Sequence, residues 1–136
     1  MAYIFGAIDK KAQREGKWFN YDEDTKIKLA FIGDPKVSSL VDFNSSALED
    51  VKETDTPEER VVKLEAIAQD RAMKISKFVL LDWDGVLDIE GEPVPYSPEL
   101  GYQALVDDQT FFSWVMKNIT NQSAFNREIK FKKAKK

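Results

Sequence analysis

The sequence predicts a mainly α-helical protein with one small N-terminal β-hairpin (α+β), in a single-domain, helical bundle-like architecture. Two strand-like runs predict the hairpin: residues 17–21 are rich in aromatic side chains, and residues 26–32 alternate apolar residues with lysines. Apolar residues at three- and four-residue steps over 61–79 predict the main helix. The 136 residues, 43% of them hydrophobic, suffice for one core, so we expect one domain over 1–136.

The composition excludes several classes of protein. A net charge of −4 argues against a nucleic-acid partner held by a general basic field, so none is expected. The absence of cysteine and histidine excludes disulfides, a thiolate zinc site and any mechanism that needs imidazole. The acidic residues 22–24 lack the glycine and the distal glutamate of a calcium loop and are interpreted as a solvated turn. We therefore expect no metal and no cofactor.

The hydropathy pattern bears on where the protein acts. No apolar run approaches the roughly 20 residues of a membrane span, and the start of the chain lacks the pattern of a signal peptide. We therefore expect no membrane contact and a cytoplasmic location.

The N-terminal region predicts an arm followed by a short helix. Residues 1–16 begin with apolar side chains, Tyr3 and Phe5 among them, and then become charged. This pattern predicts an arm that packs either on its own chain or on a neighbouring copy. Asp34 as N-cap and Pro35 at the first helical position predict the helix. Its inward face is expected to carry Val37, Leu40 and Val41.

The clearest helix start in the chain is at Thr56. Thr56 can act as N-cap, Pro57 suits the first helical position, and Glu59 completes a capping box. The apolar stripe then predicts a long helix that runs to about Leu81. On this interpretation, residues 78–81 are the end of a helix and not a strand.

Glycine and proline determine the path of the next segment. Gly85 can take a positive φ and end the long helix, and the residues before the prolines favour an extended path. Ser97 can cap another helix. The residues with an expected structural role in this turn are Gly85, Gly91, Pro93, Pro95 and Ser97.

Two more helices are expected toward the C-terminus. The helix after Ser97 runs to about Val106, and its inward residues are expected to be Leu100 with either Ala104 or Leu105. The helix after Asp107 and Asp108 carries a stripe that should close the core: Phe111, Phe112, Val115 and Ile119. Helical spacing then continues through Phe125, Ile129 and Phe131 into a basic tail, 126–136, which need not be ordered.

Residues 77–100 allow two interpretations. In the first, the apolar run 78–81 followed by Asp82, Asp84 and Gly85 is the nucleophile strand of a haloacid dehalogenase-like phosphotransferase. Asp82 would attack a phosphoryl group, Asp84 would act as acid and base, and Mg²⁺ would neutralise charge. Only about fifty residues follow Gly85, roughly one βαβ unit, and the run itself is predicted to be helical. We therefore expect no catalytic residues and no enzyme activity.

In the second interpretation the segment is a structural turn followed by a helix start. It resembles a segment of the tail assembly chaperones of lambda-like long-tailed bacteriophages (siphophages) and prophages. The resemblance rests on Trp83-Asp84-Gly85-Val86 and on Gly91-Glu92-Pro93-Val94-Pro95-Tyr96-Ser97-Pro98-Glu99. Less specific similarity extends from Lys17 to about Phe125.

The resemblance implies a non-catalytic protein of the host cell cytoplasm that is not part of the mature virion. Such a chaperone binds and solubilises the tape measure protein and recruits subunits of the major tail tube protein during tail morphogenesis. In such families a programmed ribosomal frameshift near the end of the coding region yields a longer product. Lys132-Lys133 and Lys135-Lys136 imply A-rich codons on which a ribosome can slip, and a solvated basic tail explains them equally well.

Several apolar residues are candidates for binding a partner. Trp83 and Tyr96 flank the acidic loop and either cover the core or anchor a partner. The other partner-binding candidates lie near the chain ends: Tyr3, Phe5, Phe125, Ile129 and Phe131. Because a coat around a long client needs many copies, we expect concentration-dependent, head-to-tail self-association.

Overall fold

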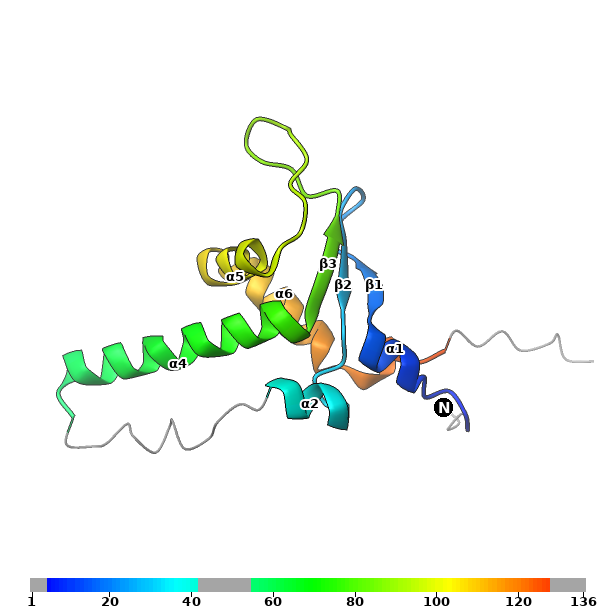
Figure 1. Ribbon diagram of the computed structural model, residues 1–136, viewed down its shortest axis with the longest axis horizontal. Helices are drawn as coiled ribbons and strands as arrows, with labels where there is room; N and C mark the ends of the chain where they lie inside the picture. Colours follow the sequence, from blue (N-terminus) through cyan, green and yellow to red (C-terminus); the bar gives the residue numbers. More distant parts are fainter. Residues whose placement is uncertain (1–4, 42–54, 128–136) are drawn as a thin grey trace, which may run out of the picture.

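The computed structural model describes residues 5–41 and 55–127, and this part of the chain is mainly helical with a small antiparallel sheet (Figure 1). The predicted fold class is therefore confirmed. That 1–136 forms a single domain stays a prediction, because the described ranges leave out both ends and one internal segment.

The sheet has three strands in the order β1-β2-β3. Strand β1 (Lys17–Asn20) and strand β2 (Lys26–Leu29) form the predicted hairpin, with Phe19 opposite Ile27. Strand β3 (Leu80–Asp84) pairs with the other side of β2 and is also antiparallel to it. The side chains that face the helices include Ile27, Leu29 and Leu80, which are fully buried.

Strand β3 corrects the expectation that 78–81 is the end of a helix. The long helix α4 (Pro57–Phe78) ends before Leu80, and the chain then pairs with β2. Residues 78–81 are all apolar, so their local pattern fits a buried helix and a buried strand equally well. Pairing with a distant strand decides between the two, and the sequence does not reveal it. Gly85 therefore ends a strand and not a helix.

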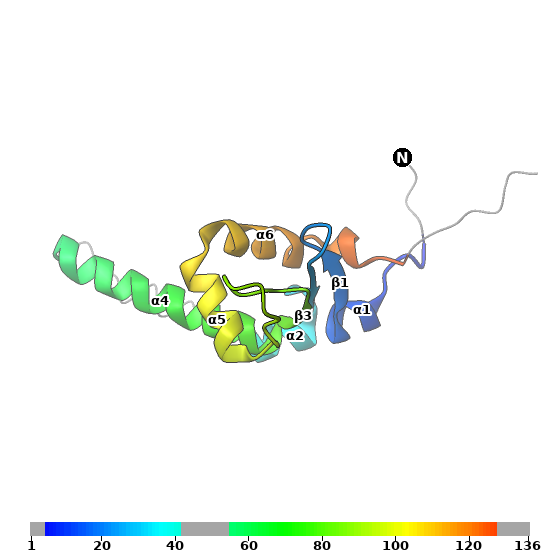
Figure 2. The ribbon, with the colours of Figure 1, turned by 90° about the horizontal axis from the view of Figure 1, so that it is seen from above.

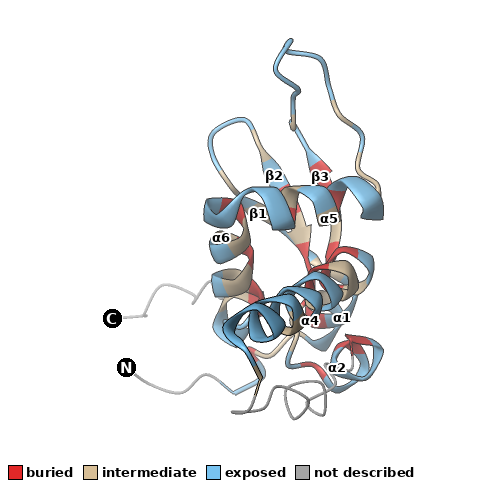
Figure 3. Ribbon diagram, turned by 90° about the vertical axis from the view of Figure 1, so that its left-hand side faces the viewer, coloured by how far each residue is buried: buried red, intermediate tan, exposed pale blue. Residues whose placement is uncertain are grey.

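Three helices cover one face of the sheet (Figures 1 and 3). The C-terminal turns of α4 pack against β3 and against α5 (Pro98–Asp107), and α6 (Gln109–Ile119) contacts α5 and β2. The stripe predicted for α6 is confirmed, since Phe111, Val115 and Ile119 are buried and Phe112 packs on the core. Leu105 is buried as expected, but Leu100 is 43% exposed, so its predicted inward position is wrong.

The predicted helix starts are confirmed. Thr56 accepts a hydrogen bond from the backbone N–H of Glu59 at 3.1 Å, and Ser97 accepts one from Leu100 at 3.2 Å. Asp34 caps α2 (Pro35–Val41) through the backbone N–H of Lys36. In α2 the buried residues are Val37 and Val41, whereas Leu40 lies on the exposed side, contrary to the prediction. No helix in the described ranges is long and apolar enough to cross a bilayer.

The described part of the N-terminal arm packs on its own chain. Helix α1 (Lys10–Glu15) lies beside the sheet, and its Arg14 Nε donates to both carboxylate oxygens of the buried Asp34 at 3.1 Å. Ala7 is buried, and its carbonyl accepts a hydrogen bond from the backbone N–H of Arg127 at 2.8 Å. The arm and the C-terminal end of the described chain therefore lie side by side.

Candidate partner-binding surface

Trp83 is buried and Tyr96 is half-buried, and both pack on the core of their own chain. The exposed fraction of Trp83 is 8%, and its indole N–H donates to the carbonyl of Val94 at 2.7 Å. The two rings pack edge to face with centroids 4.9 Å apart. The Tyr96 hydroxyl lies 2.5 Å from the carbonyl of Ser76 and 2.7 Å from that of Leu80. These contacts attach the 85–97 segment to α4 and β3, as the core alternative predicts. A role of the two residues as partner anchors stays a prediction.

The environment of Tyr96 also affects its ionisation. Burial raises the pKa of the Tyr96 phenol well above its ordinary value, and the nearby carboxylates of Asp82 and Glu99 raise it further. The phenol therefore stays protonated at neutral pH, and its O–H remains available as a donor.

Phe125 is likewise a core residue. Its ring is fully buried and packs against Phe19 and Phe31, with centroid distances of 5.1 and 5.7 Å. It ends the short 3₁₀-helix η1 (Gln122–Phe125), and Asn126 is extended, with φ −67° and ψ 157°. The predicted helical continuation beyond Phe125 is therefore wrong at its first step.

Of the remaining predicted partner residues, only Phe5 lies within the described ranges. Phe5 is 93% exposed, so it is free to make contacts outside its own chain. Tyr3, Ile129 and Phe131 lie outside the described residues.

The predicted turn residues form an ordered, projecting loop (Figure 1). Gly85 has φ +81°, and a Cβ atom there would lie 2.0 Å from the carbonyl oxygen of Asp24, so only glycine fits. Gly91 also has a positive φ, and Pro93 forms an isolated antiparallel bridge with Leu87. The structural role predicted for this segment agrees with this geometry.

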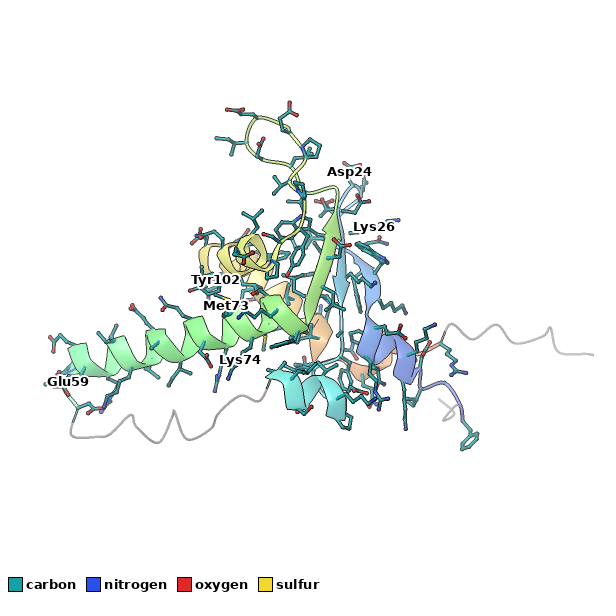
Figure 4. The ribbon with its side chains drawn as sticks, in the orientation of Figure 1. Asp24, Lys26, Glu59, Met73, Lys74 and Tyr102 are labelled. Carbon is teal, nitrogen blue, oxygen red and sulfur yellow. The ribbon has the colours of Figure 1, made fainter. Side chains whose placement is uncertain are left out.

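Asp82 and Asp84 lie on the sheet face opposite the helices, at an edge strand. Asp82 is opposite Lys28, and Asp84 is opposite Lys26, which Figure 4 shows near the β1–β2 turn. A haloacid dehalogenase-like phosphotransferase places its nucleophile at the carboxyl end of a parallel strand, whereas β3 is antiparallel to β2, its one neighbouring strand in the described part of the chain. Within the described ranges no group of three or more acidic residues is placed to hold a metal ion.

The N-terminal half of α4 projects from the body of the protein and is not packed against the core (Figures 1 and 3). No residue of this helix before Ala72 is buried, whereas Ala72, Ile75 and Ser76 are. Three large apolar side chains of the projecting half are exposed: Val61 at 52%, Val62 at 65% and Leu64 at 45%. The apolar stripe predicted for 61–79 therefore covers the core only in its second half.

An apolar groove continues from this projecting half into the body. It has a volume of about 320 Å³ and lies between α4 and the α5–α6 corner. Its lining residues are Glu65, Ala68, Gln69, Ala72, Leu105, Val106, Gln109 and Phe112. Val61, Glu65, Ala68 and Ala72 follow one another at steps of four, three and four residues, so they share one side of α4. The exposed valine and the groove thus form one continuous face, which we call the α4 groove face.

The charges around the α4 groove face are acidic. Glu58 and Glu65 lie on the same side of α4 as Ala68, and Asp107 and Asp108 lie between the groove residues Val106 and Gln109. The basic residues of α4 follow a different line on the helix: Arg60, Lys63, Arg71, Lys74 and Lys77. Figure 4 shows Lys74 pointing away from α5, on the side of α4 opposite Tyr102. An occupant of the groove should therefore be apolar and basic.

The sequence contained only an indirect signal for this surface. The stripe through Val61 and Leu64 predicts an amphipathic helix, but it does not show which part of the helix the core covers. Its length was the available hint, because a helix of 22 residues spans about 33 Å, which is more than a three-stranded sheet with short strands can cover.

Comparison with known proteins identifies the family. A model of the family described as YdaY prophage protein matches residues 32–136, which is most of the chain, so the protein belongs to this prophage family. The matched part includes α4, α5 and α6, and therefore the whole α4 groove face. No curated protein and no solved structure gave a match.

Proposed function

We propose that this prophage protein is a non-catalytic tail assembly chaperone. It binds the tape measure protein and keeps it soluble in the host cytoplasm, recruits tail tube subunits around it, and leaves before the virion is complete. Two findings support the proposal: membership of a prophage family, and the resemblance of residues 83–99 to such chaperones.

The observation that carries the proposal is the exposed α4 groove face. A helix that projects with apolar residues uncovered is a common form of interaction site. An amphipathic helix can lie in a groove of this kind and insert side chains at three- and four-residue steps. From Val61 to Ala72 the face extends about 16 Å at 1.5 Å per residue, which corresponds to three turns of a client helix.

The size of this face also suits a client that must be released. One small groove gives weak binding per copy, and many copies along a long client give strong binding overall. A coat of this type prevents aggregation and can still dissociate as tube subunits replace it.

Co-expression with the neighbouring reading frames tests the proposal. We expect a long, helix-rich client to be soluble only when this protein is present. Ala68→Lys places a charge in the groove and should reduce the soluble client several-fold. Ala66→Lys is the matched control, because Ala66 is exposed on the same helix and does not line the groove. A client that is equally soluble alone would contradict the chaperone function, and equal effects of the two variants would contradict the groove as its site.

A further inference from the structure

We propose that the lysine-rich C-terminal segment 128–136 of one copy binds the α4 groove face of a second copy. This contact links copies head to tail and covers the apolar face when no client is bound. The inference rests on the proposed function only in naming the client as the competitor, since the self-association follows from this chain alone.

The first argument is chemical complementarity. The segment contains five lysines and one glutamate, a net charge of +4, so the rest of the chain carries −8 of the total −4. The segment also contains two large apolar residues, Ile129 and Phe131, two positions apart. Residues at this spacing share one side of a chain that binds in an extended form. The groove offers an apolar floor, with Leu105 and Phe112 in its lining, and an acidic rim, so both features of the segment find a counterpart.

The second argument is the place from which the segment departs. The backbone of Arg127 is held beside the N-terminal arm through Ala7, on the α1 side of the sheet. The groove lies on the other side, where α4 projects (Figures 1 and 2). The donor and acceptor surfaces are therefore different and point in different directions. Contacts of this heterologous kind repeat from copy to copy and produce open chains or spirals.

The consequence is a link between assembly and client binding. A tail in the groove covers Ala68 and its neighbours, so a free chaperone does not expose this apolar face to unrelated proteins. A client helix competes for the same face, and its binding displaces the tail of the neighbouring copy.

Sedimentation velocity over a concentration series tests the proposal with four full-length proteins. The wild type and the control Ala66→Lys should show a sedimentation coefficient that rises with concentration. The groove variant Ala68→Lys should lose this rise, and so should the tail variant Ile129→Ala with Phe131→Ala. Circular dichroism and thermal unfolding establish that all four proteins are folded. The two α4 variants should fold because Ala66 and Ala68 are exposed.

Mixing the two defective variants gives the sharpest result. The tail of the groove variant is intact, and so is the groove of the tail variant, so the mixture should form dimers that do not grow further. Charge exchange gives an independent test: Glu65→Lys, or Lys132→Glu with Lys133→Glu, should each weaken the association, and their combination should restore it. Raising the salt from about 0.1 M to about 1 M shortens the screening length from about 10 Å to about 3 Å and should weaken the wild-type association.

The opposite outcomes overturn the inference. A wild type that stays monomeric at every concentration would do so, as would a tail variant that associates like the wild type or a mixture that forms no dimers. Client solubility is measured separately, in the co-expression assay. The tail variant should keep or increase the amount of soluble client. The two assays are independent: a negative co-expression result does not change the conclusion on self-association, and a negative sedimentation result does not change the conclusion on the chaperone function.

Discussion

Phe125→Ala separates a core role from a partner-binding role most directly. The ring of Phe125 is fully buried against Phe19 and Phe31 and connects η1 to the sheet. Replacing a buried phenylalanine with alanine removes its transfer free energy and leaves a cavity, which typically costs about 3–5 kcal/mol. Each of the two aromatic contacts that the variant loses contributes about 0.5–1.5 kcal/mol to stability in addition to the burial of the ring.

This cost is large relative to the total. Domains of this size have unfolding free energies of about 5–15 kcal/mol, so the variant should lose about a fifth or more of its stability and unfold at a lower temperature. Urea unfolding followed by circular dichroism measures the change in stability from the urea concentration at the midpoint. An unchanged dependence of the unfolding free energy on urea shows that the variant exposes the same surface area on unfolding.

Phe5→Ala is the matched control, because the same side chain is 93% exposed there. Its unfolding free energy should change by less than about 0.5 kcal/mol. If Phe125→Ala also costs less than about 1 kcal/mol and remains folded, the packing of η1 on the sheet is wrong and Phe125 returns to the list of partner residues.

Four further predictions concern the 82–97 segment. Tyr96→Phe should cost about 1–3 kcal/mol, because two carbonyls lose their shared donor. The folded-state pKa of Tyr96 is raised, so its contribution to wild-type stability should be fully present below about pH 10 and be lost as the pH rises above that value. Thermal unfolding across this pH range should show a smaller loss of stability in Tyr96→Phe than in the wild type. Gly85→Ala should cost more than about 2 kcal/mol in urea unfolding, since its left-handed backbone alone costs about 1–2 kcal/mol and the Asp24 carbonyl clashes with a Cβ. An aryl phosphate assay with Mg²⁺ should show no turnover, and turnover abolished by Asp82→Asn would overturn the non-catalytic assignment.

The features that the sequence predicted well are those specified by neighbouring residues. The cap at Thr56 and the cap at Ser97 each depend on a side chain and a backbone N–H three residues later. The β1–β2 hairpin likewise depends on two adjacent runs and a short polar turn. Each of these features depends only on residues that are close together in the sequence, so the sequence is sufficient to predict it.

The features that the sequence did not predict depend on distant partners. Strand β3 forms because Leu80 and Trp83 find Leu29 and Ile27 across the sheet, and the apolar run before Asp82 has no feature that requires a strand. For the same reason, the sequence does not decide whether Trp83 and Tyr96 cover the core or lie on the surface. Their burial depends on how the 85–97 loop returns to α4, and this is a tertiary contact.

The projecting half of α4 combines exposed apolar residues with strong local helix signals. A helix that is not packed along its length is marginal in water, so the outer turns need stabilisation from within. Thr56 and Pro57 start the helix, and Glu58 and Glu59 lie in the first turn, where an acid is favourable. At the same end, Lys63 pairs with Asp55 at 3.0 Å. The chain therefore keeps these turns helical without burying them, which leaves Val61 and the groove beyond it available to a partner. A helix serving the core alone would need none of this outer half.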